Sequence, residues 1–310
     1  MYKSFFNLQA CPFGSSPDPQ FLWVMPQIRE TLSSLQYGIA ARKGFVVITG
    51  EVGTGKTTLL KTVLNKFDND RISTAFVFNP RLDVLDFLEF VLTDFGITPV
   101  ARTKSAMLIQ LNRWLVERSR NNGVCVIVID EAQNLSLDLL EEIRLLTNIE
   151  TSSDKLVQIV LAGQPELEEK LSDPSVRQLR QRVWMWCKTH ALTSQETKEY
   201  IAQRLRLAGT TDRVFTDDAV HAVHAYSKGV PRVINLLCEH SLINAYVEQI
   251  KPIPTHIIEA AVLELALDHR PFFLPPKALT DSQGNGSPLD ASNFIESVSN
   301  EAYVESQPNL

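Results

Sequence analysis

The sequence predicts an α/β fold, in which a parallel sheet flanked by helices is followed by a small α-helical domain. Up to residue 189, short apolar runs alternate with segments of helical periodicity, which favours parallel strands joined by right-handed helical crossovers. From residue 194 the pattern is purely helical. A glycine-rich octapeptide at residues 50–57, Gly-Glu-Val-Gly-Thr-Gly-Lys-Thr, lies between an apolar run and a helical segment. This order of strand, glycine loop and helix predicts a phosphate-binding P-loop.

The elements follow from periodicity along the chain. The run at 124–129 is entirely apolar, as is typical of a strand buried on both faces of a parallel sheet. Strands are expected at 45–49, 74–78, 124–129, 157–162 and 183–189. Helices are expected at 27–42, 57–67, 84–95, 105–121 and 136–148, and then at 194–208, 216–227, 232–247 and 255–267.

Four regions are therefore expected. Residues 1–25 are rich in proline and aromatic residues, which predicts an extended, packed segment rather than a helix. A nucleotide-binding core at 26–192 and a helical lid domain at 193–270 follow. Residues 271–310 are expected to be a disordered acidic tail, because their Pro, Ser, Asn, Gly and acidic residues cannot form a core.

Bulk composition narrows the protein class. The 310 residues are 44% hydrophobic, enough for a sizeable core, and no apolar run approaches the ~18 residues of a membrane span. The N-terminus shows no basic-then-apolar signal segment, and the four cysteines have no metal-site spacing. We expect a cytoplasmic protein, at most peripheral to an inner membrane through a partner. The net charge of −6 and the absence of a basic stripe argue against nucleic-acid binding without excluding a local patch.

The P-loop predicts ATP and Mg²⁺ as ligands. Its glycines let successive backbone N–H groups face phosphate oxygens, and the following helix presents its positive dipole end. The Lys56 ammonium can reach the β- and γ-phosphates, and the Thr57 hydroxyl can bind Mg²⁺. The expected nucleotide-binding residues of the loop are Gly50, Glu51, Val52, Gly53, Thr54, Gly55, Lys56, Thr57 and Thr58.

Two consecutive acids after the buried run indicate an ATP hydrolase. Asp130 is placed to hold Mg²⁺ beside the P-loop, and Glu131 to polarise a water for attack on the γ-phosphate. The base-reading Asn/Thr-Lys-x-Asp motif of GTPases is missing, because Thr103-Lys104 is followed by Ser105-Ala106. The alternative interpretation of the two acids is an acidic helix cap after a strand.

Taken together, residues 1–267 resemble AAA+ ATPases of the secretion-pathway protein A type, often called ExeA-like, which also occur beside exopolysaccharide and exosortase gene clusters. A more distant resemblance is to ATPase regulators of DNA transposition. The secretion proteins usually continue into a membrane span and a peptidoglycan-binding module, whereas this sequence ends in a short acidic segment. The blocks that carry the resemblance are residues 49–58, Phe-Asn-Pro-Arg-Leu at 78–82, Val-Ile-Asp-Glu-Ala-Gln-Asn-Leu at 128–135, Leu-Leu-Thr-Asn at 145–148, Gly-Gln-Pro-Glu-Leu at 163–167, Gln-Leu-Arg-Gln-Arg at 178–182 and Gly-Val-Pro-Arg at 229–232.

The resemblance implies further site residues. Asn79 corresponds to a polar residue that can hydrogen-bond the catalytic carboxylate and hold it off the water; an Asx turn before Pro80 is the alternative. Gln164 matches sensor 1, or else caps a turn. Arg232 matches sensor 2, a lid-domain cation on the phosphates, or else is a salt-bridged surface residue.

The family also places an arginine finger before the last strand, where it reaches the γ-phosphate of the neighbouring subunit. Arg180 and Arg182 are our candidates, with Arg177 nearby, although three arginines in six residues also suit a solvated surface. The implied partners are ATP, an ATP-dependent homo-oligomer and an envelope secretion or polysaccharide-export protein. Two alternatives remain open, namely a DNA-associated ATPase that regulates transposition and a slow nucleotide switch.

Overall fold

The computed structural model describes residues 1–14, 18–21, 23, 26–67, 71–78, 81–151 and 154–267. Five strands form one sheet in the order β2-β3-β4-β1-β5, and every neighbouring pair is parallel. The predicted parallel sheet is therefore confirmed. The strands are β1 (Phe45–Thr49), β2 (Ile72–Val77), β3 (Val124–Ile129), β4 (Val157–Gly163) and β5 (Val183–Lys188).

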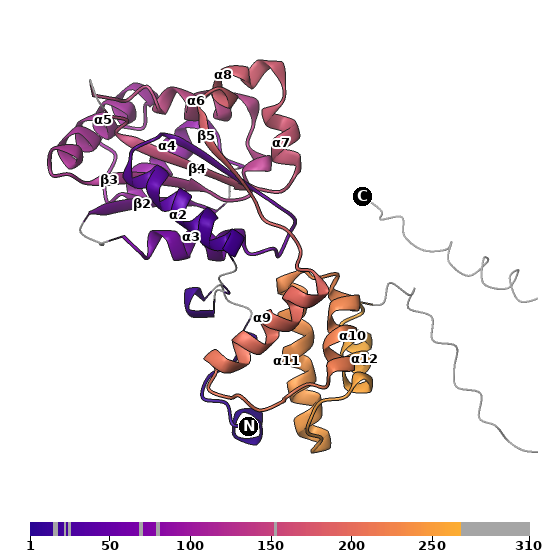
Figure 1. Ribbon diagram of the computed structural model, residues 1–310. Helices are drawn as coiled ribbons and strands as arrows, with labels where there is room; N and C mark the ends of the chain where they lie inside the picture. The colour runs from indigo at the N-terminus through magenta and orange to yellow at the C-terminus, as the bar shows by residue number, and fades with distance from the viewer. Residues whose placement is uncertain are drawn as a thin grey trace, which may run out of the picture. The chain divides into compact units, whose positions relative to one another are not determined.

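Helices cover both faces of the sheet (Figure 1). Alternate side chains of the strands enter two hydrophobic clusters, so that Val126 and Val128 of β3 face one layer and Cys125 and Ile127 face the other. The first layer is α2 (Pro26–Ala40) and α3 (Lys56–Leu64). The second contains α4 (Val84–Asp94), α5 (Lys104–Arg120), α6 (Leu137–Leu146), α7 (Glu166–Leu171) and α8 (Arg177–Arg180).

Strand register aligns the ends that carry the candidate site. Thr49, the last residue of β1, lies opposite Gly163 of β4, and Ile129 of β3 lies opposite Leu161. The segments that follow β1, β3 and β4 therefore leave the sheet at one edge. This is where open parallel sheets bind ligands.

Four helices that follow β5 in the described chain share a second hydrophobic cluster. A capping box joins Thr193 and Glu196 at the start of α9, while Pro231 occupies the first turn of α11. The bounds are α9 (Ser194–Leu207), α10 (Asp217–Ser227), α11 (Pro231–Glu248) and α12 (Thr255–Glu264).

The N-terminal segment differs from the expected extended form. Residues Tyr2–Phe5 form one helical turn, α1, because the first proline comes only at position 12; a 3-10 turn, η1, spans Pro19–Phe21. The segment packs on the helical unit, since Phe6 and Phe13 are buried in its hydrophobic cluster.

Two short helices, α7 and α8, were not predicted, because six and four residues are too few to show a helical period. The expected tail, 271–310, lies outside the described residues. Within the described part of the chain, no helix is long and apolar enough to cross a membrane.

Candidate nucleotide site

The octapeptide connects β1 to α3, as expected. Gly50, Gly53 and Gly55 adopt positive φ angles of 158°, 81° and 97°, and Gly55 is the residue that caps α3. The loop is braced from within, because Thr54 Oγ1 donates to the backbone oxygen of Glu51 over 2.7 Å. Glu51 and Val52 are exposed at its tip. The result is a preformed turn at a helix N-terminus, the arrangement that binds phosphate.

Lys56 is folded onto this loop. Its Nζ donates to the backbone oxygens of Gly50 (2.7 Å) and Glu51 (3.0 Å), and the side chain is buried. Burial lowers the pKa of the ammonium, whereas the nearby Glu131 and Asp130 carboxylates oppose that shift. Lys56 forms no ion pair with any residue that the structure describes, so an anionic ligand would gain a full charge-assisted contact.

Thr57 and Asp130 meet across the sheet edge although they are 73 positions apart. Thr57 Oγ1 donates to Asp130 Oδ2 over 2.8 Å. Thr57 lies in the first turn of α3, and Asp130 directly follows β3. Hydroxyl and carboxylate oxygens are the ligands that Mg²⁺ takes beside substrate phosphates.

Glu131 follows in a left-handed conformation, with φ 52°. Its Oε2 accepts hydrogen bonds from Gln133 Nε2 (2.6 Å) and from Gln164 Nε2 (3.2 Å). The hydrogen bond from Gln133 is the largest cause that lowers the pKa of this carboxyl group; the Gln164 amide and the Lys56 ammonium act in the same direction. The carboxylate is therefore kept ionised, as a general base must be.

The two residues implied by the sensor motifs are differently placed. Gln164, just after β4, contacts Glu131 as described above. Arg232 lies in the first turn of α11, and its backbone N–H donates to the oxygen of Gly53 over 3.2 Å. A Cβ atom built on Gly53 would lie only 2.7 Å from Arg232 Cβ, so the P-loop needs glycine at this close approach. Asn79 lies outside the described residues.

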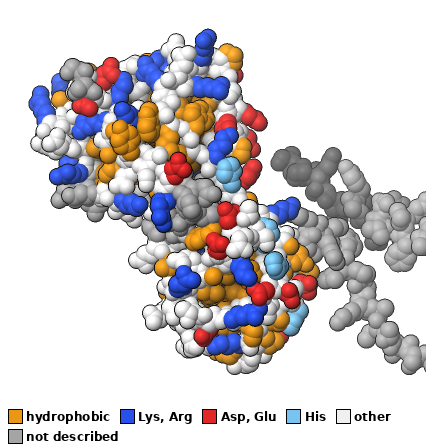
Figure 2. All heavy atoms as spheres, in the orientation of Figure 1, with side chains coloured by type: hydrophobic (Ala, Val, Ile, Leu, Met, Phe, Trp, Pro, Cys, Tyr) orange, Lys and Arg blue, Asp and Glu red, His pale blue; other side chains and the backbone are white. Residues whose placement is uncertain are grey.

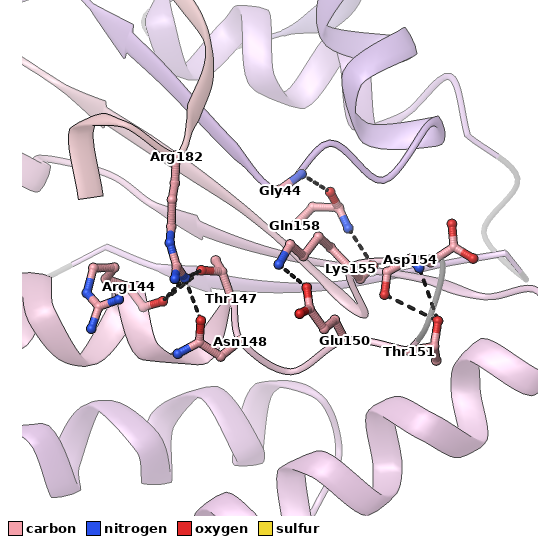
Figure 3. A network of polar contacts seen from close by, with 10 residues as sticks. All are labelled: Gly44, Arg144, Thr147, Asn148, Glu150, Thr151, Asp154, Lys155, Gln158 and Arg182. Atoms are coloured by element: carbon pink, nitrogen blue, oxygen red, sulfur yellow. Dashed lines mark hydrogen bonds and ion pairs between the residues drawn. The ribbon is translucent and has the colours of Figure 1, made fainter. Parts of the chain in front are cut away.

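The arginines before β5 have distinct environments. Arg182 Nη1 donates to three oxygens at the C-terminal end of α6, which belong to the Arg144 carbonyl (3.2 Å), the Thr147 hydroxyl (2.8 Å) and the Asn148 amide (2.7 Å) (Figure 3). Arg180, in α8, is exposed and makes no hydrogen bond or ion pair with the described residues.

Several contacts at the site were missed by sequence reasoning. Thr189 Oγ1 lies 2.6 Å from Thr54 Oγ1, and it would lie 2.1 Å from a Cβ atom on Gly50. Glu168 of α7 accepts from Thr49 Oγ1 (2.5 Å) and from Lys188 (2.6 Å), which joins the ends of β1 and β5. Glu168, Lys188 and Thr189 lie outside the sequence motifs, so only the contacts in the folded chain identify them.

Comparison with known proteins supports the assignment of the fold. Residues 39–171 match the AAA domain family. General secretion pathway protein A of Aeromonas hydrophila is 38% identical over 247 residues, which is 79% of this chain and 45% of that protein. The chain thus spans less than half the length of this relative. The resemblance inferred from the sequence blocks is confirmed.

Solved structures with low sequence identity share the fold. Cdc6p of Pyrobaculum aerophilum superposes with a TM-score of 0.64 at 18% identity, covering 84% of this chain and 70% of that one. The ORC2 protein of Aeropyrum pernix, in its ADPNP-ADP complexes, gives 0.59 at 17% identity, covering 79% and 71%. The RuvB branch migration motor of Thermotoga maritima gives 0.54 at 19%, covering 78% and 70%.

Proposed function

For this AAA-type P-loop ATPase, we propose that Mg-ATP binds between the P-loop and Asp130 and is hydrolysed to ADP and phosphate, with Glu131 as the general base. The hydrogen bond between Thr57 and Asp130 carries the proposal, because it brings the hydroxyl that follows the P-loop lysine to the acid that follows β3. A glycine-rich turn that arose by chance would have no reason to contact an acid at the end of β3. The activity rests on positioning and charge stabilisation, as phosphoryl transfer generally does.

Each residue has a separate task in this scheme. The loop N–H groups and the N-terminus of α3 hold the phosphates, and Lys56 exchanges its two carbonyl contacts for the β- and γ-phosphate oxygens. Thr57 and Asp130 would hold Mg²⁺, which supplies charge neutralisation at the phosphates when bound. Glu131 accepts the proton of the attacking water, while Gln164 and Arg232 bind the γ-phosphate side of the site.

We assign the arginine finger to Arg180 rather than Arg182. Arg182 is already engaged by the end of α6 in its own chain, and leaving those acceptors would break three contacts. Arg180 is exposed and unpaired among the described residues, so it is available to a neighbouring protomer. In this proposal the active form is an ATP-dependent homo-oligomer, and the finger contributes about 10³–10⁵-fold to hydrolysis.

The work coupled to hydrolysis is proposed to be assembly or regulation of a secretion or polysaccharide-export system. Similarity to general secretion pathway protein A supports this role. The DNA-associated alternative receives less support, because basic side chains are interspersed with acidic and apolar ones on the face shown in Figure 2 and form no continuous stripe there. A DNA complex whose affinity falls steeply with salt would favour that alternative.

The proposal is tested by measuring ATP binding and ATP hydrolysis in three variants. Lys56→Ala should lose most ATP affinity, because a charge-assisted contact to the phosphates is removed while the loop and fold remain. Arg180→Ala should bind ATP almost normally yet hydrolyse it poorly. Mixing Arg180→Ala with Glu131→Gln should restore activity at interfaces that combine an intact Glu131 with an intact Arg180. Unchanged affinity in Lys56→Ala would overturn the nucleotide site, and absence of rescue would overturn catalysis between subunits.

A further inference from the structure

Gln133 makes two hydrogen bonds that connect two parts of the candidate site. It lies in η2, the 3-10 turn Ala132–Asn134 that follows the two acids. Its Nε2 donates to Glu131 Oε2 over 2.6 Å, while its Oε1 accepts from the backbone N–H of Gln164 over 3.1 Å. The reversed amide would face the carboxylate with an oxygen and the N–H with an NH₂ group. The two partners therefore select one orientation of the side chain.

These contacts leave the Glu131 carboxylate asymmetric. Its Oε2 receives both side-chain amides, from Gln133 and from Gln164. Its Oε1 accepts no hydrogen bond from any residue that the structure describes. One oxygen is thus anchored and the other is free, which is the arrangement expected of an oriented base rather than of a carboxylate used for a structural ion pair.

The turn that carries Gln133 is itself fixed from α7. Lys170 Nζ donates to the backbone oxygen of Leu135 over 2.7 Å and also to the backbone oxygen of Gln133. Gly163 at the end of β4 leaves room for the amide, since a Cβ atom there would lie 2.8 Å from Gln133 Oε1. The backbone position of the turn, the orientation of the Gln133 amide and the space beside Gly163 all favour the contact between Gln133 and Glu131.

We propose that Gln133 is a positioning residue for hydrolysis, which holds Glu131 in the orientation that presents its free oxygen to the attacking water. This inference rests on the proposed function, since it needs Glu131 to be the base. It assigns Gln133 to the catalytic rate and not to nucleotide affinity, because the hydrogen bonds of its side chain go to Glu131 and Gln164 and not to the P-loop or to the Thr57–Asp130 pair. Because Gln133 also accepts the N–H of Gln164, the proposal links the end of β4 to the orientation of Glu131.

The test compares two near-isosteric variants in the full-length protein. Gln133→Met removes both hydrogen bonds. Gln133→Glu keeps an acceptor for the Gln164 N–H but replaces the donor to Glu131 with a second carboxylate. The matched control is Asn134→Ala, a change at the exposed neighbouring amide. For each protein, kcat and KM for ATP, equilibrium binding of a fluorescent ATP analogue and thermal unfolding are measured, and Gln133→Met is repeated in a Glu131→Gln background.

Positioning predicts that Gln133→Met lowers kcat by about 10–100-fold at unchanged ATP affinity and that Gln133→Glu lowers it at least as much. In the Glu131→Gln background, Gln133→Met should add little to the loss, because the two residues act as one unit. An unchanged or increased kcat, near-normal activity of Gln133→Glu, or a full additional loss in the Glu131→Gln background would overturn the inference. Wild-type turnover by Glu131→Gln itself would instead overturn the proposed base.

Discussion

Replacing Arg182 with alanine separates a structural arginine from a catalytic one. In the structure, one guanidinium nitrogen of Arg182 serves three oxygens at the end of α6. A hydrogen bond from a charged group contributes about 1.5–3 kcal/mol, and a cation at a helix C-terminus about 0.3–1 kcal/mol. Because the side chain is half-exposed and one nitrogen is shared, we expect Arg182→Ala to cost about 2 kcal/mol in the free energy of unfolding.

This cost is measurable by thermal and urea unfolding. For a chain of this size, about 2 kcal/mol corresponds to a decrease in Tm of roughly 3–4 °C. Arg180→Ala, the matched control, should change stability by less than about 0.5 kcal/mol, because its side chain is exposed and unpaired among the described residues. The effects on ATP hydrolysis per folded molecule should be the reverse: Arg180→Ala should hydrolyse ATP poorly, whereas Arg182→Ala should keep most of its activity. A stable Arg182→Ala with abolished hydrolysis would refute this reasoning and return the finger to Arg182.

The remaining predictions concern Mg²⁺, the thiols and assembly. Thr57→Val should raise the Mg²⁺ concentration needed for half-maximal hydrolysis, whereas Thr57→Ser, which keeps the hydroxyl, should not. Equal Mg²⁺ requirements of the two variants would show that Thr57 does not bind the metal. Burial raises the pKa of the Cys125 and Cys187 thiols to about 12. At pH 8, iodoacetamide should therefore modify the exposed Cys11 in the folded protein, and all four cysteines only after unfolding. Mass spectrometry of the intact chain counts the modified cysteines in each state. Turnover should rise more steeply than protein concentration while assembly is incomplete, and strict proportionality would indicate a monomeric enzyme.

Much of the fold could be predicted because its signals are local. The run 124–129 is apolar throughout, and it forms β3 with those bounds. The P-loop is a contiguous motif whose glycines all adopt positive φ. The sequence also predicted that Asp130 lies beside the P-loop, because parallel strands end at one edge of the sheet, but it did not predict the direct hydrogen bond from Thr57.

The contacts that could not be predicted depend on side chains that approach only in the folded chain. Nothing in the sequence distinguishes the amide of Gln133 from that of its neighbour Asn134, yet one contacts Glu131 and the other is exposed. Likewise, Arg180 and Arg182 are equivalent by position in a basic run. Their difference arises because β5 begins beside the end of α6, a tertiary relation with no local signature.

The most direct test of the account is a single turnover by Glu131→Gln. The variant keeps Lys56, Thr57 and Asp130, so it should bind radiolabelled ATP with nearly wild-type affinity in Mg²⁺. Without the base, conversion of the bound ATP to ADP should slow by about 10²–10⁴-fold, so that intact ATP is recovered with the protein after filtration. Recovery of ADP at the wild-type rate would contradict the account, because Glu131 would then not be the base.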